Sequence, residues 1–217
     1  MFAAVMCGGK STRLKIHYNI EKPLLKINQI TMIERIIQTL LNTREFSKIF
    51  LITSSNTPKT RSFLLNRFVN YQNIHILTES GIEYSSDLFG FLKHISHYSD
   101  ERIFILPSDI PFIKQETIKK IIYSKFDDAV FTTVLIDKSF VEKIGIKPSI
   151  IKILNDTKYC YSGISLYNPI FVDKQIFEGN KNNSILLKEN YLVINEVDLS
   201  INVNTTSDFA IAKKLIQ

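Results

Sequence analysis

The chain has 217 residues and a formal net charge of +6, with 45% hydrophobic and 22% charged residues. This balance is typical of a globular domain, and no stretch approaches the roughly 20 apolar residues that span a bilayer. The N-terminal apolar run is too short for a signal peptide, so we expect a single cytoplasmic domain without stable membrane insertion.

Short apolar runs alternate with segments of helical periodicity along the chain. The apolar runs predict strands at 2–6, 48–53, 73–77, 102–107 and 128–136. Helical spacing predicts helices at 32–42, after 57, at 85–95 and at 114–124, with Thr31 as an N-cap and Pro58 in a first turn. Weaker patterns predict strands at 158–168 and 191–197 and a terminal helix after residue 205.

Strands that alternate with helices predict an α/β fold of the Rossmann-like type, with a mostly parallel central sheet and helices on both faces. Ligands of such folds bind beyond the carboxyl ends of the strands. Residues that follow a predicted strand are therefore the first candidates for a functional site.

The first such segment is MCGGKSTRL at 6–14, which contains the letters of a P-loop ending. A P-loop requires a glycine five residues before Gly9, and this position is Ala4, inside the first strand. Pro23 and a polar stretch also separate the segment from the next helix, whereas a P-loop runs directly into one. The P-loop interpretation is therefore disfavoured.

Paired glycines let the backbone approach an anion and direct N–H groups at it. Arg13 adds a planar fork for phosphate oxygens, and Lys22 adds a point charge. Gly8, Gly9, Ser11 and Arg13, followed by Lys22-Pro23-Leu24, resemble the nucleotidyltransferase signature G-G-x-[SG]-x-R…K-P-[LM]. The spacing between the arginine and the lysine is longer here than in that signature. A plain glycine turn with basic surface residues is the alternative.

Two later motifs extend this resemblance. LPSDIPFI at 106–113 resembles the metal-binding D-x-P turn of the family, which implies that Asp109 holds Mg²⁺, a cation that prefers oxygen ligands and phosphates. In INVNTTSDF at 201–209, Asn204 is at the position that provides a second metal contact in some relatives. The alternatives are that Asp109 caps the next turn and that Thr205 or Thr206 caps the last helix.

Segments 53–60, 80–88, 147–150 and 162–169 resemble, in order, the archaeal GTP:adenosylcobinamide-phosphate guanylyltransferases, which belong to the wider MobA-like nucleotidyltransferases. The resemblance implies transfer of GMP from GTP to adenosylcobinamide phosphate in cobalamin biosynthesis. It implies catalysis by Arg13, Lys22 and Asp109, a nucleotide-binding half at about 1–110 and an acceptor-binding half at about 111–217, with the acceptor near Gly163. The expected nucleotide-binding residues are Gly8, Gly9, Lys10, Ser11, Thr12, Arg13, Lys22, Asn56, Thr57, Glu79 and Asp87.

A carboxylate is the simplest reader of the guanine N–H groups, and Asp87, then Glu79, is the candidate because both follow the third predicted strand. Either acid could instead stabilise a helix start through the helix dipole. Asn56 and Thr57 are expected at the base or the ribose.

Cys7 and Cys160 fit neither a disulfide framework nor a zinc pattern, and Cys7 is expected to be a small buried thiol rather than a nucleophile. His94 and His97 have the spacing of a helical metal pair, but two ligands on a solvated helix face favour a surface role.

The scattered lysines favour small anionic substrates over nucleic acid. Two other functions stay open at this point. One is a related transferase that acts on molybdopterin or on a sugar or polyol phosphate, and the other is a non-catalytic nucleotide-binding protein. The oligomeric state is also open, with a homodimer as one option.

Overall fold

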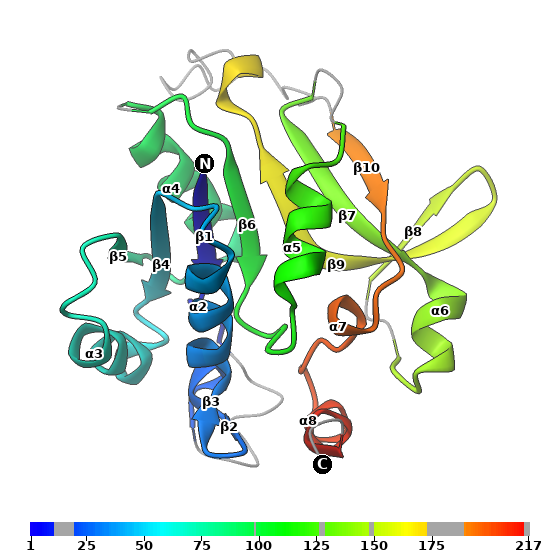
Figure 1. Ribbon diagram of the computed structural model, residues 1–217, viewed down its shortest axis with the longest axis horizontal. Helices are drawn as coiled ribbons and strands as arrows, with labels where there is room; N and C mark the ends of the chain where they lie inside the picture. The colour runs from blue at the N-terminus through cyan, green and yellow to red at the C-terminus, as the bar shows by residue number, and fades with distance from the viewer. Residues whose placement is uncertain (11–19, 98, 126–128, 148–149, 173–188, 215–217) are drawn as a thin grey trace.

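The computed structural model describes residues 1–10, 20–97, 99–125, 129–147, 150–172 and 189–214. In this part of the chain one eight-stranded sheet has the order β10-β7-β9-β6-β1-β4-β5, with β8 paired to β9 (Figure 1). The strands are β1 (Phe2–Met6), β4 (Lys48–Ser54), β5 (Ile74–Glu79), β6 (Ile103–Pro107), β7 (Phe131–Asp137), β8 (Ile151–Leu154), β9 (Thr157–Tyr167) and β10 (Glu189–Val193).

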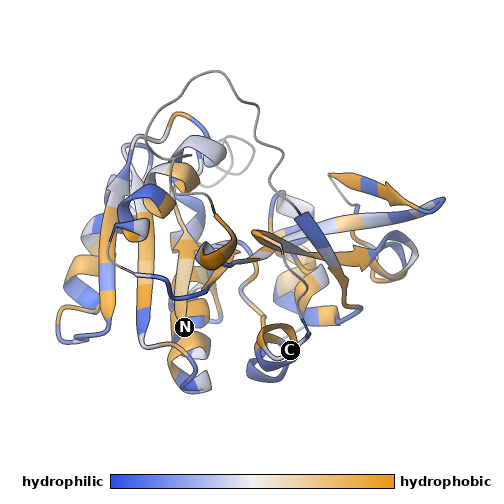
Figure 2. Cartoon of the chain, turned by 90° about the horizontal axis from the view of Figure 1, so that it is seen from above, coloured by the Kyte–Doolittle hydropathy of each residue, from blue (hydrophilic) through white to orange (hydrophobic). Residues whose placement is uncertain are grey.

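Neighbouring strands are parallel except at β9, which runs antiparallel to β6, β7 and β8. The predicted mostly parallel sheet is therefore confirmed. The β8–β9 hairpin extends away from the rest of the sheet, as both Figure 1 and Figure 2 show.

Helices cover both faces of the sheet, as predicted. They are α2 (Met32–Thr43), α3 (Pro58–Arg67), α4 (Tyr84–Ser96), α5 (Gln115–Ile122), α6 (Lys138–Lys143), α7 (Val197–Ser200) and α8 (Thr206–Lys214), with short 3-10 turns η1 (Lys22–Leu24) and η2 (Pro169–Phe171). Within the described residues, none of these helices is long and apolar enough to cross a membrane.

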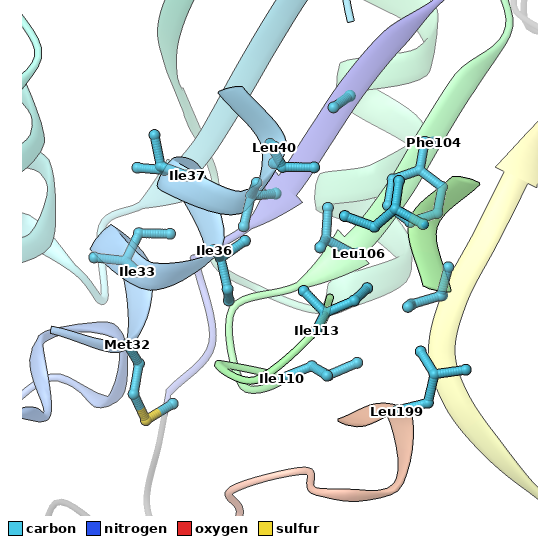
Figure 3. Close-up of a cluster of buried hydrophobic side chains, with 14 of the residues drawn as sticks. Met32, Ile33, Ile36, Ile37, Leu40, Phe104, Leu106, Ile110, Ile113 and Leu199 are labelled. Carbon is cyan, nitrogen blue, oxygen red and sulfur yellow. The ribbon is translucent and has the colours of Figure 1, made fainter. Parts of the chain in front are cut away.

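The alternating side chains of β1 explain the two layers. Ala3 and Val5 belong to a buried cluster that includes α2 and α5, whereas Phe2, Ala4 and Met6 pack in a second cluster with α4. Figure 3 shows part of the first cluster, where Leu106, Ile110 and Ile113 lie between the side chains of α2 and that of Leu199. Figure 2 shows hydrophobic residues concentrated on the strands and on the helix faces turned towards them.

Several short elements were not predicted from the sequence. The hairpin of β2 (Lys26–Ile27) and β3 (Ile30–Thr31) turns at Asn28 and Gln29, which both have positive φ without the glycine that usually marks such a turn. The predicted strand at 191–197 is wrong at its end, because β10 stops at Val193 and α7 begins at Val197. Strands β2, β3 and β8 have four residues or fewer, too few for a periodic pattern to stand out.

The sheet order determines where a ligand can bind. Strand β1 lies between β4 and β6, so the chain leaves β1 towards one side of the sheet and later returns on the other. This reversal opens a crevice at the carboxyl ends of β1 and β6. Met6 is paired with Pro107, and the N–H of Ser108 donates to the carbonyl of Met6 at 3.1 Å. The segments that follow the two strands therefore start side by side.

Candidate active site

A cavity of about 320 Å³ lies at this crevice. We call it the β1–β6 cavity, and its wall consists of residues 6–10, 22–23, 81–84, 87 and 107–109. Of the residues that the sequence predicts to bind nucleotide, the structure brings together Gly8, Gly9, Lys10, Lys22 and Asp87, with Asp109 beside them. Ser11, Thr12 and Arg13 lie outside the described residues.

A compact polar cluster closes one side of this cavity. The Lys22 Nζ donates to Asp109 Oδ2 at 2.6 Å and to Asn204 Oδ1 at 2.9 Å. These three residues come from η1, from the turn after β6 and from the segment before α8. The predicted phosphate-binding lysine and the two predicted metal ligands are therefore direct neighbours.

The C-terminal segment reaches Asp109 through the backbone. The N–H of Val203 donates to the Asp109 carbonyl at 2.8 Å, and the Asn204 amide is oriented by a 2.7 Å bond to Asn202. Thr205 Oγ1 accepts from the N–H of Asp208, whose Oδ2 accepts from the N–H of Thr205 at 2.8 Å. A helix cap by Thr205 and a site contact by Asn204 were alternatives in the sequence analysis. In the structure both occur, at adjacent residues.

Asp109 is 8% exposed, and its Oδ1 is buried without a hydrogen-bond partner in the described part of the chain. A buried carboxylate oxygen without a partner is costly, so this atom is a candidate acceptor for a bound group. The described residues contain no group of three or more His, Cys, Asp or Glu side chains placed to bind a metal. A cation here would depend on Asp109, Asn204 and substrate oxygens.

The two glycines after β1 differ in their surroundings. The Ser54 Oγ donates to the Gly8 carbonyl at 2.7 Å, and a Cβ on Gly8 would lie 3.0 Å from the Ser54 Cβ. A Cβ on Gly9 would meet no atom within 4 Å. Gly8 is therefore needed by the protein's own packing, whereas Gly9 leaves open space at the cavity wall.

Cys7 is buried at 1% exposure, and burial raises the pKa of its thiol far above the ordinary value. The thiol stays protonated at neutral pH and is a poor nucleophile. The expectation of a small buried side chain is confirmed.

Asp87 is 4% exposed and holds the loop between β5 and α4. Its Oδ1 accepts from the N–H of Gly81 at 2.8 Å and from the Ser80 hydroxyl at 3.0 Å. Its Oδ2 would lie 3.2 Å from a Cβ on Gly8, so this oxygen faces the glycine turn. One carboxylate oxygen is thus used by the loop, and the other lies against the turn that follows β1.

Tyr84, the first residue of α4, also lines the β1–β6 cavity. Although the side chain is 52% exposed as a whole, loss of solvation around its hydroxyl and then the Asp109 carboxylate raise the pKa of Tyr84 to about 12. The phenol therefore stays neutral at physiological pH and can donate a hydrogen bond.

Three predicted nucleotide-binding residues do not line the β1–β6 cavity. Asn56 donates from Nδ2 to the Gly81 carbonyl at 2.7 Å, and the Thr57 Oγ1 accepts from the N–H of Ser54 at 3.1 Å. Both side chains hold the turn after β4 instead. The Glu79 carboxylate lies over Gly90 of α4, and desolvation, followed by the charge of Asp87, raises its pKa. Asn56 and Thr57 follow β4, whereas Glu79 is the last residue of β5. A role for these three residues in nucleotide binding stays a prediction.

A second cavity, of about 560 Å³, adjoins the first, and we call it the β9 cavity. The two share Tyr84 and Pro107 in their walls. The β9 cavity is lined mainly by apolar side chains and contains Gly163, the residue predicted near the acceptor. Gly163 has φ +85°, and a Cβ there would lie 2.9 Å from Pro107 Cγ. Only glycine suits this point, where β9 passes close to the end of β6.

Glu21 was not predicted from the sequence, although it directly precedes Lys22. Its buried carboxylate accepts hydrogen bonds from the N–H groups of Lys59 and Thr60 at the start of α3. A lone acid beside a basic residue gives no signal of such a long-range contact.

Comparison with known proteins shows the family of the chain. Residues 3–140 match the model of the MobA-like NTP transferase domain. The chain is 30% identical to the adenosylcobinamide-phosphate guanylyltransferase of Methanocaldococcus jannaschii, over 100% of this chain and 98% of that protein.

Solved structures share the fold at lower identity. The 4-diphosphocytidyl-2C-methyl-D-erythritol synthase of Anaerococcus prevotii superimposes with a TM-score of 0.68 at 14% identity, covering 99% of this chain and 95% of that one. HddC from Yersinia pseudotuberculosis gives a TM-score of 0.68 at 16% identity and covers 100% of both chains. Together with the match over residues 3–140 and the full-length relative, these similarities show that the chain belongs to the MobA-like NTP transferase family and is a nucleotidyltransferase.

Proposed function

We propose that this protein transfers GMP from GTP to the phosphate of adenosylcobinamide phosphate, releasing pyrophosphate. The observation that carries the proposal is the Lys22–Asp109–Asn204 cluster, of which Lys22 and Asp109 line the β1–β6 cavity together with the Gly8-Gly9 turn. The named relative from Methanocaldococcus jannaschii supports the choice of donor and acceptor, since the similarity extends over both chains.

The chemistry of the acceptor agrees with the residues at hand. A phosphate monoester has a second pKa of about 6, so it is mostly ionised at neutral pH and needs no general base. An acceptor oxygen attacks the α-phosphorus, the bond from that phosphorus to the β-phosphate oxygen breaks, and pyrophosphate leaves with the bonding electrons. No histidine is among the described residues that line the cavity, and Cys7 is buried as a neutral thiol.

Catalysis then consists of positioning and charge neutralisation. In this proposal the N–H groups of Gly8, Gly9 and Lys10 hold phosphate oxygens, and Lys22 neutralises charge that moves to the leaving group. Arg13 is proposed for the same task. Asp87 is proposed to read guanine through the oxygen that faces Gly8, because its other oxygen is occupied by the Gly81 loop.

Asp109 and Asn204 are the residues that would hold Mg²⁺. The partnerless buried Oδ1 of Asp109 and the amide oxygen of Asn204 fit this hard cation, which takes its remaining ligands from water and substrate phosphates. When bound, the cation would neutralise phosphate charge and orient the leaving group. In the structure the Lys22 ammonium occupies oxygens of both residues.

The acceptor is proposed to bind at the β9 cavity. Its apolar wall, which includes Leu88, Phe131 and Ile164, suits a large macrocycle with apolar faces, and the wall it shares with the first cavity brings the two substrates together. The N-terminal half would thus bind the nucleotide, and the C-terminal half would bind the acceptor.

Calorimetry with GTP, ATP, CTP and UTP, each with and without Mg²⁺, is the first test. We expect GTP to bind with clear preference, and pyrophosphate to form when adenosylcobinamide phosphate is added. A preference for CTP or UTP would overturn the proposal in favour of a sugar- or polyol-phosphate transferase. Transfer of GMP only to molybdopterin would move the activity to that cofactor, and GTP binding without pyrophosphate release would indicate a binding protein.

A further inference from the structure

Glu21 is a second buried acid close to the Lys22–Asp109–Asn204 cluster. Its carboxylate accepts hydrogen bonds from backbone N–H groups of a helix that is distant in the sequence. Glu21 is 4% exposed, and both carboxylate oxygens accept hydrogen bonds. Oε1 accepts from the N–H of Lys59 at 2.9 Å, and Oε2 accepts from the N–H and the hydroxyl of Thr60 at 2.6 Å each. The carboxylate therefore satisfies the free N–H groups in the first turn of α3.

Helix α3 has no cap of its own. Thr57 occupies the N-cap position but makes no side-chain cap bond, and Pro58, the first helical residue, has no N–H to donate. A helix N-terminus attracts negative charge, so a carboxylate is well suited to this place. Glu21 thus acts as the missing cap from a segment 38 residues earlier in the chain.

The contact also fixes the backbone beside Lys22. The N–H of Leu24 donates to the Glu21 carbonyl at 2.9 Å, which closes the η1 turn, and Pro23 is buried within that turn. Lys22, whose ammonium meets Asp109 at 2.6 Å, is the next residue after Glu21. Leu64 of α3 belongs to the hydrophobic core. The helix to which Glu21 binds is therefore itself held in place by core packing.

We propose that Glu21 is a positioning residue for Lys22. By binding the N-terminus of α3, it holds the η1 turn in the register from which the Lys22 side chain reaches the β1–β6 cavity. The inference rests on the proposed function only for its effect on catalysis. The effect on the position of Lys22 can be measured in the protein without substrates.

Glu21→Gln tests this role, because an amide replaces one of two acceptor oxygens with a donor that faces a backbone N–H. Glu34→Gln is the matched control. Glu34 also caps a helix through its carboxylate, accepting from the N–H and the hydroxyl of Thr31 at the start of α2 and from Arg67. The same chemical change is thus made in two helix caps, and only one of them adjoins Lys22.

The first measurement is NMR of protein labelled with ¹³C at the lysine ε-carbons, with the Lys22 signal assigned through Lys22→Arg. We expect Glu21→Gln to move the Lys22 signal towards that of exposed lysines and Glu34→Gln to leave it in place. We further expect Glu21→Gln to lower kcat at least tenfold with little change in the KM of the acceptor. Glu34→Gln should lower only the melting temperature.

An unchanged Lys22 signal in Glu21→Gln, or an equal change in Glu34→Gln, would overturn the proposal. If Glu21→Gln does not fold, Thr60→Val removes a single donor to the same carboxylate and should give the same shift at smaller size; no shift there also overturns it. A wild-type protein that transfers no nucleotide would overturn the proposed function, while the NMR comparison would still decide the role of Glu21.

Discussion

Two groups of neighbouring strands build different walls of the candidate site. The first group is β5, β4, β1 and β6, and the second is β9, β7 and β10. The first group is entirely parallel, and its strands end at the edge where the glycine turn, Lys22 and Asp109 lie. The second group contains the reversed, 11-residue strand β9 and presents the mainly apolar β9 cavity. Aligned strand ends gather backbone N–H groups and charges, whereas a long reversed strand offers side chains along its length.

This difference predicts that the two walls bind different substrates. The polar edge would bind the triphosphate and stabilise charge, and the apolar wall would bind the acceptor. Tyr84 and Pro107 belong to both walls and mark the place where the reacting groups would meet. Variants of the polar edge should therefore act on nucleotide binding and on the chemical step, and variants of the apolar wall should act on the acceptor.

The largest effect is expected at the polar edge. Lys22→Met and Asp109→Asn should each lower kcat for pyrophosphate release by about 100-fold or more, as loss of a group that stabilises transition-state charge does. Circular dichroism should show both variants folded. Full activity of both variants would show that this cluster is not the catalytic centre.

The proposed binding of a metal ion can be tested at the same edge without turnover. Lys22→Met removes the cation that now contacts Asp109 and Asn204, so Mn²⁺ should bind the nucleotide-free protein about tenfold more tightly. Asp109→Asn should weaken Mn²⁺ binding. Electron paramagnetic resonance of free Mn²⁺ measures both affinities, and equal affinities in all three proteins would remove Asp109 from the metal site.

The glycine turn gives a smaller effect that separates packing from binding. Gly9→Ala meets no atom within 4 Å, so the melting temperature should stay the same while GTP affinity falls about tenfold, since the added methyl group occupies space that phosphate needs. Gly8→Ala, by contrast, crowds Ser54 and should lower the melting temperature as well. Unchanged GTP affinity in Gly9→Ala would mean that the phosphates bind elsewhere.

The smallest effect on activity is expected at the apolar wall. Gly163→Ala should raise the KM of the acceptor a few-fold and leave GTP affinity unchanged. Gly145→Ala is the control, because Gly145 has a similar φ of +83° and no atom within 4 Å of a Cβ. Both variants should lose about 1–2 kcal/mol of stability from backbone strain, and Gly163→Ala should lose more because of the contact with Pro107. Equal changes in GTP and acceptor binding would argue against two separate walls.

Prediction from the sequence succeeded where the signal is local. Thr31, the predicted N-cap, caps α2, and the apolar run at 2–6 forms the central strand. Gly8, Gly9, Lys22 and Asp109 were predicted because they follow strands or belong to a motif. The structure places all four at one cavity, and their part in binding or catalysis stays a prediction.

The sequence does not give the direction of a side chain, which decides the role of that side chain. Asn56 and Thr57 follow β4 and Glu79 ends β5, yet their hydrogen bonds and contacts are with neighbouring turns or with α4. Position along the chain gives the edge of the sheet, but the local turn geometry decides whether a side chain faces the cavity.

The sequence by itself determined the alternation of strands and helices, the glycine turn and the basic and acidic residues beyond the strand ends, because each of these depends on neighbours a few residues away. The tertiary structure decided that Lys22 meets Asp109 and Asn204, residues 87 and 182 positions further along the chain, and that Glu21 caps α3. These contacts depend on the order of strands in the sheet and on the packing of helices against it. Such relations arise only when the whole chain is folded, so no local pattern could contain them.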